Sequence, residues 1–300
     1  MFKDGEIICF LGDSITANDL WLSEFYQTVR KTRRIKCYNC GISGGSAEGS
    51  LLYLYSRCLN FNPDTVVLML GINDIKRTLY SDSCLNDKSY DGERAEALEK
   101  HKAAYEELVT RITDFGARVI LCTPVPYDEW SNSKEELFRC QSAMDGLAEF
   151  VRGLADKYGC TLVDLCGELK PMIKERQVIS ADRVHPTPWG YHCIAQIFLA
   201  SLGQIESPDF DTPFVMEEWN QKRHDALMEI HGVNFIKYCA LLRPKFVEGK
   251  SQSELLEMAR ERYGSFEDKS TFIPKSYLDY INKIDKYEEY MAQIVKLTIF

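Results

Sequence analysis

The sequence predicts an α/β protein in which a mainly parallel sheet of five strands lies between two layers of helices. Short apolar runs alternate with amphipathic segments of helical length between residues 6 and 202, which is the pattern of strands followed by helices. Strand–helix–strand units of this kind form right-handed crossovers, and the strands they connect are parallel. Beyond Ser207-Pro208-Asp209 no strand pattern remains, so an all-helical C-terminal extension is expected.

The individual elements follow from these patterns in chain order. The expected strands are residues 6–12, 35–41, 65–71, 118–124 and 160–166. The expected helices of the core begin at about residue 18 and then cover 48–59, 93–115, 135–158 and 191–202, with a long loop at 76–93. A flavodoxin-like strand order, 2-1-3-4-5, would gather the carboxyl ends of the first three strands around one crevice.

Two domains are expected, a core at residues 1–205 and a helical extension at residues 206–300, divided by a polar, proline-containing linker. The extension is expected to hold helices at 219–242, 253–263 and 277–297. Its last helix carries an apolar stripe made of Tyr277, Tyr280, Ile281, Ile284, Tyr287, Tyr290, Met291 and Ile294. We favour packing of this stripe against the core; a homodimer interface and a wall of the substrate cleft are the alternatives.

The composition is that of an ordinary globular protein, with 45% hydrophobic and 27% charged residues. The formal charge of -9, from 45 acidic against 36 basic residues, leaves no basic surface for nucleic acid, and we expect no such partner. No secretory signal pattern and no apolar run of bilayer-spanning length is seen, so a cytoplasmic protein without membrane insertion is expected. The 11 cysteines are scattered and are expected to be reduced and buried.

The most informative segment is Gly12-Asp13-Ser14-Ile15-Thr16, which directly follows the first expected strand. A serine at the carboxyl end of a buried strand lies where open α/β sheets bind their ligands, which makes Ser14 a candidate nucleophile. An α/β-hydrolase elbow would have glycine two residues after the serine, and Thr16 stands there instead. That fold is therefore not favoured.

A serine hydroxyl needs a positioned base, and His185 is the best candidate among the five histidines. It lies in Asp182-Arg183-Val184-His185-Pro186, which supplies a carboxylate three residues earlier. A carboxylate at one ring nitrogen would hold the tautomer in which the other nitrogen takes the serine proton. A backbone carbonyl that orients the ring in place of Asp182 is the alternative.

Two further strand ends offer hydrogen-bond donors for an oxyanion. The segment that ends at Gly44 provides a backbone N–H with no side chain in its way, and Gly71-Ile72-Asn73-Asp74 provides the amide group of Asn73. Stabilisation of an oxyanion is often the largest single contribution to catalysis of acyl transfer.

The four blocks follow one another along the chain as those of Ser14, Gly44, Asn73 and His185. In this order they resemble the SGNH hydrolases, also called GDSL-type esterases and lipases. The resemblance covers roughly residues 5–204. It implies a catalytic triad of Ser14, His185 and Asp182. It also implies an oxyanion hole formed by the N–H groups of Ser14 and Gly44 and by the side chain of Asn73.

The resemblance implies a serine-dependent ester hydrolase that works through an acyl-enzyme. Short acyl esters, acetyl esters above all, of carbohydrates or other small alcohols are the expected substrates. A lipase, lysophospholipase or thioesterase of the same family is the alternative, as is a non-catalytic binding module that retains the fold. No metal-ligand cluster, phosphate loop or dinucleotide motif is present in the sequence, so neither a metal nor a cofactor is expected.

Four more residues are candidates for the surroundings of the substrate cleft: Asp13, Asp74, Tyr127 and Trp130. Asp13 and Asp74 flank the serine and the asparagine, and we expect them to act as hydrogen-bond acceptors that shape these loops. Tyr127 and Trp130 follow the fourth strand, and they are expected to face the cleft together with the loop at 76–93. Polar and aromatic surroundings favour a sugar ester over a lipid.

Overall fold

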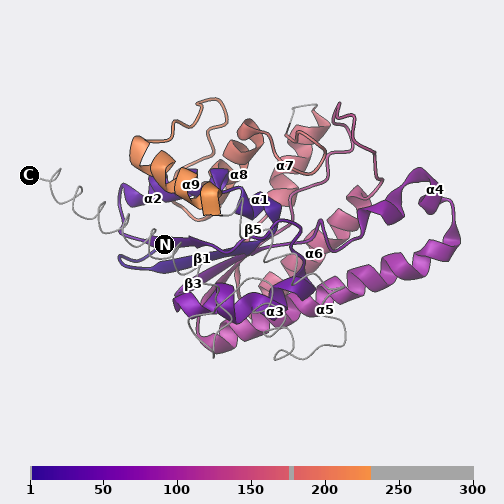
Figure 1. The fold of residues 1–300 in the computed structure, drawn as a ribbon, viewed down its shortest axis with the longest axis horizontal. Coiled ribbons are helices and arrows are strands. Elements are labelled where there is room, and N and C mark those ends of the chain that lie inside the picture. Colours follow the sequence, from indigo (N-terminus) through magenta and orange to yellow (C-terminus); the bar gives the residue numbers. More distant parts are fainter. Residues whose placement is uncertain (1, 176–178, 231–300) are drawn as a thin grey trace, which may run out of the picture.

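The computed structural model describes residues 2–175 and 179–230. Its single sheet consists of β1 (Ile7–Gly12), β2 (Lys36–Asn39), β3 (Thr65–Met69), β4 (Arg118–Cys122) and β5 (Thr161–Val163). The strands are ordered β2-β1-β3-β4-β5, and all neighbouring pairs are parallel (Figure 1). The predicted flavodoxin-like, three-layer α/β/α fold is thus confirmed.

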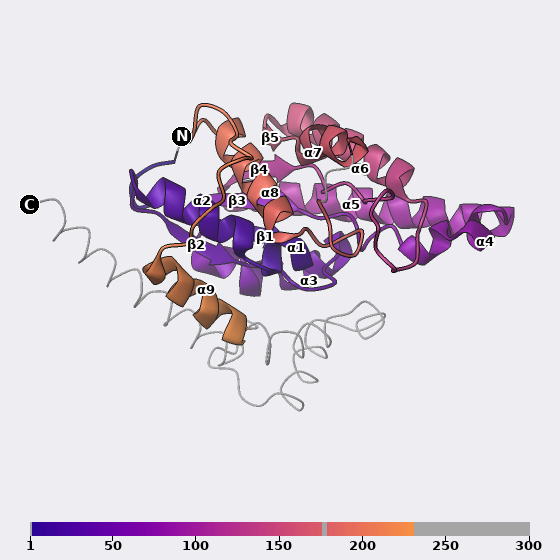
Figure 2. The ribbon, with the colours of Figure 1, turned by 90° about the horizontal axis from the view of Figure 1, so that it is seen from above.

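Helices cover both faces of the sheet. On one face lie α2 (Leu20–Arg30), α7 (Leu165–Lys174) and α8 (Pro188–Ser201), and on the other lie α3 (Ala47–Arg57), α5 (Asp91–Phe115) and α6 (Gln141–Tyr158) (Figure 1). The helix α9 (Glu218–Ile230) lies against α2 (Figure 2). Shorter pieces are α1 (Ser14–Ala17), α4 (Asp82–Leu85) and 3-10 helices at Leu59–Phe61, Arg77–Tyr80 and Lys88–Tyr90, so the expected loop at 76–93 contains short helical turns.

The hydrophobic core consists of two clusters, one on each face of the sheet, and β1 contributes apolar side chains to both. Cys9 and Leu11 point into the cluster under α3, α5 and α6, whereas Ile8 and Phe10 point into the cluster under α2, α7 and α8. Alternation of this kind is what a strand buried between two helical layers requires. Phe10 packs edge-on against Trp21 with ring centroids 5.4 Å apart. The packing orients α2, and with it the chain that leaves β1.

Several element boundaries differ from the sequence prediction, and for two of them the contacts give the reason. The helix expected at 135–158 begins only at Gln141, because the backbone before it forms hydrogen bonds to distant side chains: the Arg183 guanidinium donates to the Glu135 carbonyl at 3.2 Å, and the Phe138 N–H donates to the Tyr127 hydroxyl at 3.1 Å. The strand expected at 160–166 ends at Val163. Asp164 then caps the unpredicted helix α7 by accepting a hydrogen bond from the N–H of Gly167.

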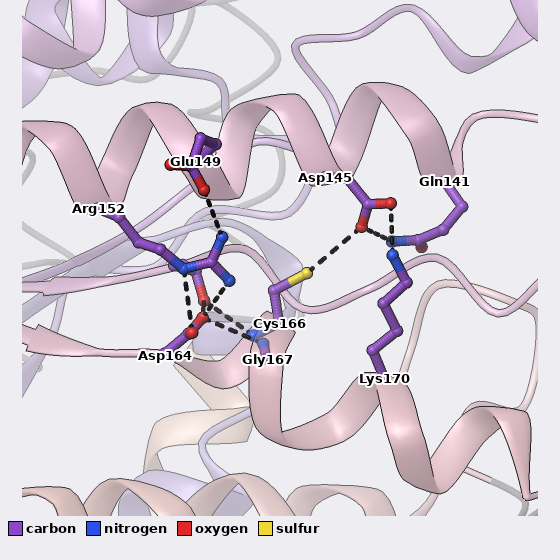
Figure 3. Close-up of polar contacts among 9 residues, drawn as sticks. Gln141, Asp145, Glu149, Arg152, Asp164, Cys166, Gly167 and Lys170 are labelled. Carbon is purple, nitrogen blue, oxygen red and sulfur yellow. Dashed lines mark hydrogen bonds and ion pairs between the residues drawn. The ribbon is translucent and has the colours of Figure 1, made fainter.

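A polar cluster joins α6 to α7 (Figure 3). The guanidinium of Arg152 donates two hydrogen bonds to the Asp164 carboxylate, of 3.0 and 2.8 Å. Lys170 on α7 forms an ion pair with Asp145 on α6. Because Arg152 and Asp164 are only about a third exposed, at 30% and 34%, this double bond is expected to exceed a typical surface ion pair in strength. The cluster fixes the first turns of α7 against α6.

The described part of the extension consists of residues 206–217, much of it exposed, and of α9, which covers the first part of the helix expected at 219–242. The helices expected at 253–263 and 277–297, with the apolar stripe and the homodimer interface proposed for it, lie outside the described residues. The domain boundary at residue 205 stays a prediction. Within residues 2–175 and 179–230, no helix combines the length and the apolar character needed to span a membrane.

Candidate active site

Ser14 lies at the carboxyl edge of the sheet, directly after β1. It is the first residue of α1, and the Asp13 side chain caps this helix by accepting a 2.9 Å hydrogen bond from the N–H of Ile15. Gly12 permits the tight turn, because a Cβ there would lie 2.2 Å from the Thr16 hydroxyl oxygen and 2.9 Å from the Met69 carbonyl oxygen. The local sequence therefore turns the chain sharply and leaves the serine half-buried.

A continuous chain of hydrogen bonds runs from Ser14 through His185 to Asp182. The Ser14 Oγ lies 2.8 Å from His185 Nε2, and His185 Nδ1 lies 2.6 Å from Asp182 Oδ2. The carboxylate is held from its other oxygen, which accepts hydrogen bonds from the N–H groups of Val184 and His185 at 3.0 and 2.7 Å. The structure thus brings together the three residues that the sequence predicted, and the ring of His185 meets the aspartate side chain.

These contacts set the charge of the aspartate. Burial acts to raise the pKa of the Asp182 carboxyl, but the hydrogen bonds from the His185 ring and from the two backbone N–H groups outweigh it and hold the pKa below its usual value. Asp182 is therefore ionised at neutral pH. An ionised acceptor favours a proton on Nδ1 of His185, which leaves Nε2 free to accept the proton of Ser14.

Arg183 is a residue of the site that the sequence reasoning missed. Its backbone has φ of 75°, in the left-handed region, and its buried side chain reaches the segment 128–135. The Asp128 N–H returns a 2.9 Å hydrogen bond to the Arg183 carbonyl. The only signal in the sequence was the position of this arginine between the aspartate and the histidine. In the structure Arg183 is 8% exposed, and an arginine is buried to this extent only when it has partners. It fixes the loop that carries both side chains.

The second and third strand ends are tied to each other beside Ser14. The Asn73 amide donates a 3.0 Å hydrogen bond to the Gly45 carbonyl, and the Asp74 carboxylate accepts a 2.8 Å hydrogen bond from the N–H of Ala47. Gly44 has φ of 74°, a conformation that glycine adopts without strain. A Cβ on Gly45 would lie 2.9 Å from the Ile42 carbonyl oxygen and 3.2 Å from that of Gly12, so the loop passes close to the end of β1.

The two aspartates expected near the cleft are buried in these loops. The Asp13 side chain caps α1, and the Asp74 side chain is 4% exposed and lies 3.2 Å from Nδ1 of His101. Burial first, and then the nearby charge of Asp74, raise the pKa of Asp13 to about 7. Both carboxyl groups shape the loops, as the sequence reasoning held, and neither is an open part of a cleft.

Of the two aromatic candidates, only one is exposed. Tyr127 is 1% exposed, and its hydroxyl donates to the Glu136 carbonyl at 3.3 Å and accepts from the Phe138 N–H at 3.1 Å. The expectation that it faces substrate is wrong, because a strand-end tyrosine can equally well fill the core beneath the following loop. Trp130 is 50% exposed and stays a candidate.

Three cysteine sulfurs, those of Cys9, Cys40 and Cys58, lie within 4.8 Å of one another in the core. A metal would need them as thiolates. Burial, first of all, raises the pKa of Cys9 and of Cys58 well above the usual value for a thiol. In the protein without a metal, the thiols of Cys9 and Cys58 are therefore protonated and behave as small apolar side chains, and the Cys9 thiol donates a 3.6 Å hydrogen bond to the Cys58 carbonyl oxygen.

In this three-layer α/β/α fold, a hydrogen-bonded serine, histidine and aspartate lie at the carboxyl edge of the sheet. This arrangement indicates an ester hydrolase. Comparison with known families narrows the class: the model of the GDSL-like lipase/acylhydrolase family matches residues 10–193. The match spans more than half of the chain, and the protein belongs to this family of carboxylic ester hydrolases. The resemblance seen in the sequence is confirmed.

Known relatives agree with this assignment. The acetylxylan esterase of Geobacillus stearothermophilus is 26% identical over an alignment of 219 residues, which covers 66% of this chain and 94% of that enzyme. The structure of a catalytic mutant of an acetylxylan esterase from the same organism has a TM-score of 0.57 at 23% identity, over 69% of this chain and 99% of that one. BT4096, a gut microbial diltiazem-metabolizing enzyme, has a TM-score of 0.59 at 23% identity over 68% of this chain. The matched part is 48% of its own length, so this chain spans about half of that protein.

Proposed function

We propose that this protein hydrolyses acetyl esters of carbohydrates through an acyl-enzyme formed on Ser14. The observation that carries the proposal is the 2.8 Å contact between Ser14 Oγ and His185 Nε2, backed by the 2.6 Å contact from His185 to Asp182. A serine hydroxyl becomes a nucleophile when a base is positioned at this distance. The choice of an acetyl ester is supported by the acetylxylan esterase relative, which this chain matches over 94% of its length.

The reaction follows from these contacts. His185 Nε2 takes the Ser14 proton while Oγ attacks the ester carbonyl. The tetrahedral intermediate then collapses, and the leaving alcohol takes that proton from His185. A water molecule then gives a proton to the same nitrogen and attacks the acyl carbonyl. When this second tetrahedral intermediate collapses, Ser14 Oγ leaves and takes that proton from His185, and acetate is released. Throughout, the ionised Asp182 stabilises the positive charge on the imidazole.

The oxyanion that forms twice in this cycle needs donors, and the N–H groups of Ser14 and Gly44 with the Asn73 amide are proposed for it. Asn73 supports this role because one of its amide hydrogens is held by the Gly45 carbonyl, which fixes the group in place and leaves the second hydrogen for the substrate. A pre-positioned donor contributes more than one that must first be ordered.

An acetylated sugar fits the surroundings better than a lipid. A lipase that works at interfaces should expose a contiguous apolar surface. In the described residues, two of the exposed large apolar side chains, Leu52 and Tyr55, lie on α3, and the others come from separate parts of the chain: Leu85, Phe115, Trp130 and Val215.

The test is hydrolysis of p-nitrophenyl esters of increasing acyl length, together with acetylated xylo-oligosaccharides, by the wild type, Ser14→Ala and Ser142→Ala. Ser142 is an exposed serine on α6 and serves as the control. We expect activity on acetyl esters that Ser14→Ala abolishes and Ser142→Ala keeps, with a fluorophosphonate labelling only the wild type and Ser142→Ala. Preference for long acyl chains would refute the substrate class, and a folded wild type that neither reacts with the probe nor hydrolyses any ester would refute the enzyme.

A further inference from the structure

The helix α9 lies outside residues 10–193, which match the family, yet its side chains reach a buried carboxylate, that of Asp19, between α1 and α2. Arg223 is 5% exposed on its side chain, and its Nη2 lies 3.1 Å from Asp19 Oδ2. His224 approaches the same oxygen at 3.4 Å. Asp19 is fully buried and connects α1 to α2 with φ of 68°, a left-handed conformation that is uncommon for a residue with a side chain.

The docking of α9 on α2 is extensive, so this contact does not depend on one ion pair. The amide of Asn220, a fully buried side chain, donates to the Ser23 carbonyl at 2.8 Å. The Arg223 guanidinium also lies 4.8 Å from the centroid of the Tyr26 ring and donates through Nε to the Asn220 side-chain oxygen at 3.2 Å. Arg223 is thus held in one orientation by three kinds of partner.

Asp19 passes this contact on to the catalytic loops through Asn39. Asp19 Oδ1 accepts a 3.0 Å hydrogen bond from the Asn39 amide, which also donates to the Thr16 carbonyl at 2.9 Å. The Asn39 side-chain oxygen in turn accepts from the N–H of Gly41 at 3.0 Å. Thr16 belongs to α1, the helix of Ser14, and Gly41 lies three residues before Gly44. The Asn39 side chain therefore forms hydrogen bonds to both the serine helix α1 and the loop that leads to Gly44.

The two segments are in direct contact, so small displacements at Asn39 would be felt by both. A Cβ on Gly41 would lie 2.4 Å from the backbone nitrogen of Ala17, the last residue of α1. Buried carboxylates are stable only with a cation or several donors, and the cation here comes from α9. Burial acts to raise the pKa of Asp19, but the charge of Arg223 and the contact with His224 outweigh it and keep the pKa low.

We propose that Arg223 is a positioning residue of the active site, which acts from α9 through Asp19 and Asn39 to set the spacing between the serine helix α1 and the loop of Gly44. This role goes beyond the proposed hydrolysis and rests on it for its activity readout. It gives the extension a function in catalysis. Misplacement of reacting groups by about 1 Å can cost about 100-fold in rate, so a modest loosening at Asn39 suffices.

The experiment compares Arg223→Met with Lys222→Met, a variant that removes an exposed cation from the same helix. Both are assayed on p-nitrophenyl acetate well below their unfolding midpoints. We expect Arg223→Met to lower kcat by about tenfold or more and to leave KM within about twofold, with fluorophosphonate labelling slowed by the same factor. Lys222→Met should match the wild type, and Arg223→Lys should restore part of the loss. A folded Arg223→Met with wild-type kcat overturns the proposal.

A double-variant cycle keeps the proposal testable if Arg223→Met is unstable. Asp19→Asn removes the buried charge, and asparagine tolerates the left-handed backbone at this position. If Arg223 acts through Asp19, adding Arg223→Met to Asp19→Asn should change kcat by less than about twofold. A further fall of about tenfold in the double variant would show that Arg223 acts by another route and would overturn the proposal.

Hydrogen exchange separates this inference from the proposed function. In Arg223→Met, amide exchange should rise in peptides covering 12–19 and 39–45, and in Lys222→Met it should not. A rise confined to α9 and α2 overturns the positioning role, whatever the enzyme hydrolyses. If instead the wild type shows no Ser14-dependent labelling, it is the proposed function that fails.

Discussion

Replacement of Asp182 by asparagine tests the catalytic reasoning most directly, because it changes the charge and the donor pattern but not the size of the side chain. The oxygen that accepts the N–H groups of Val184 and His185 can stay in place. The new NH2 group would then face Nδ1 of His185, 2.6 Å away in the wild type. Nδ1 must accept this bond, so the ring proton moves to Nε2, where it blocks transfer from Ser14.

The expected loss can be worked out from these contacts. A hydrogen bond to a charged group contributes about 1.5–3 kcal/mol, which is a factor of about 10–100 in rate. The wrong tautomer adds to this, and in a buried triad the total reaches about 10,000-fold. Because the side chains of His185 and Asp182 are 44% and 40% exposed, water can solvate the ring and we expect a smaller loss, of about 100–1,000-fold in kcat.

The assay is hydrolysis of p-nitrophenyl acetate at neutral pH, with KM measured alongside kcat. Asp156→Asn, a change at an exposed aspartate on α6, is the matched control and should leave kcat unaltered. An Asp182→Asn enzyme whose kcat stays within about threefold of the wild type would refute the reasoning, since the wrong tautomer alone should cost more.

Three further changes test other parts of the site. Burial and the charge of Asp74 raise the pKa of Asp13 to about 7, against about 3.9 unfolded, so the free energy of unfolding should fall as pH rises between these values. Asp13→Asn should remove this fall, which amounts to about 2.5 kcal/mol between about pH 5 and about pH 8, in urea denaturation at these two pH values; an equal fall in both proteins would argue against a buried proton. Asn73→Ala should lower kcat by about 100–1,000-fold with little change in KM, and an unchanged kcat would remove this amide from the oxyanion hole. Arg183→Met should lower the free energy of unfolding by about 2–4 kcal/mol because it leaves buried carbonyl groups without donors. Arg139→Met, at a side chain that is 49% exposed, should have little effect in the same urea titration, and equal midpoints for the two variants would contradict the anchoring role.

The order of strands and helices could be predicted because each depends on short-range pattern. The run from Ile7 to Leu11 is apolar at every position, and such a run between two helical layers is a buried strand whatever surrounds it. The candidate residues were found for a related reason. Parallel strands end at one edge of the sheet, so Ser14, Gly44 and Asn73 had to lie near one another once the strand order was known.

What the sequence by itself determined, then, is the fold class and the four blocks at the strand ends, since periodicity and turn residues are local properties. Tertiary structure alone decided the features that depend on partners far along the chain. Arg183 bonds the Glu135 carbonyl, at the expected start of helix α6, from 48 positions away, and Tyr127 turns into the core because Glu136 and Phe138 offer it hydrogen bonds. The contact of Arg223 with Asp19 spans 204 positions, and no local pattern encodes which buried charge a distant cation will meet.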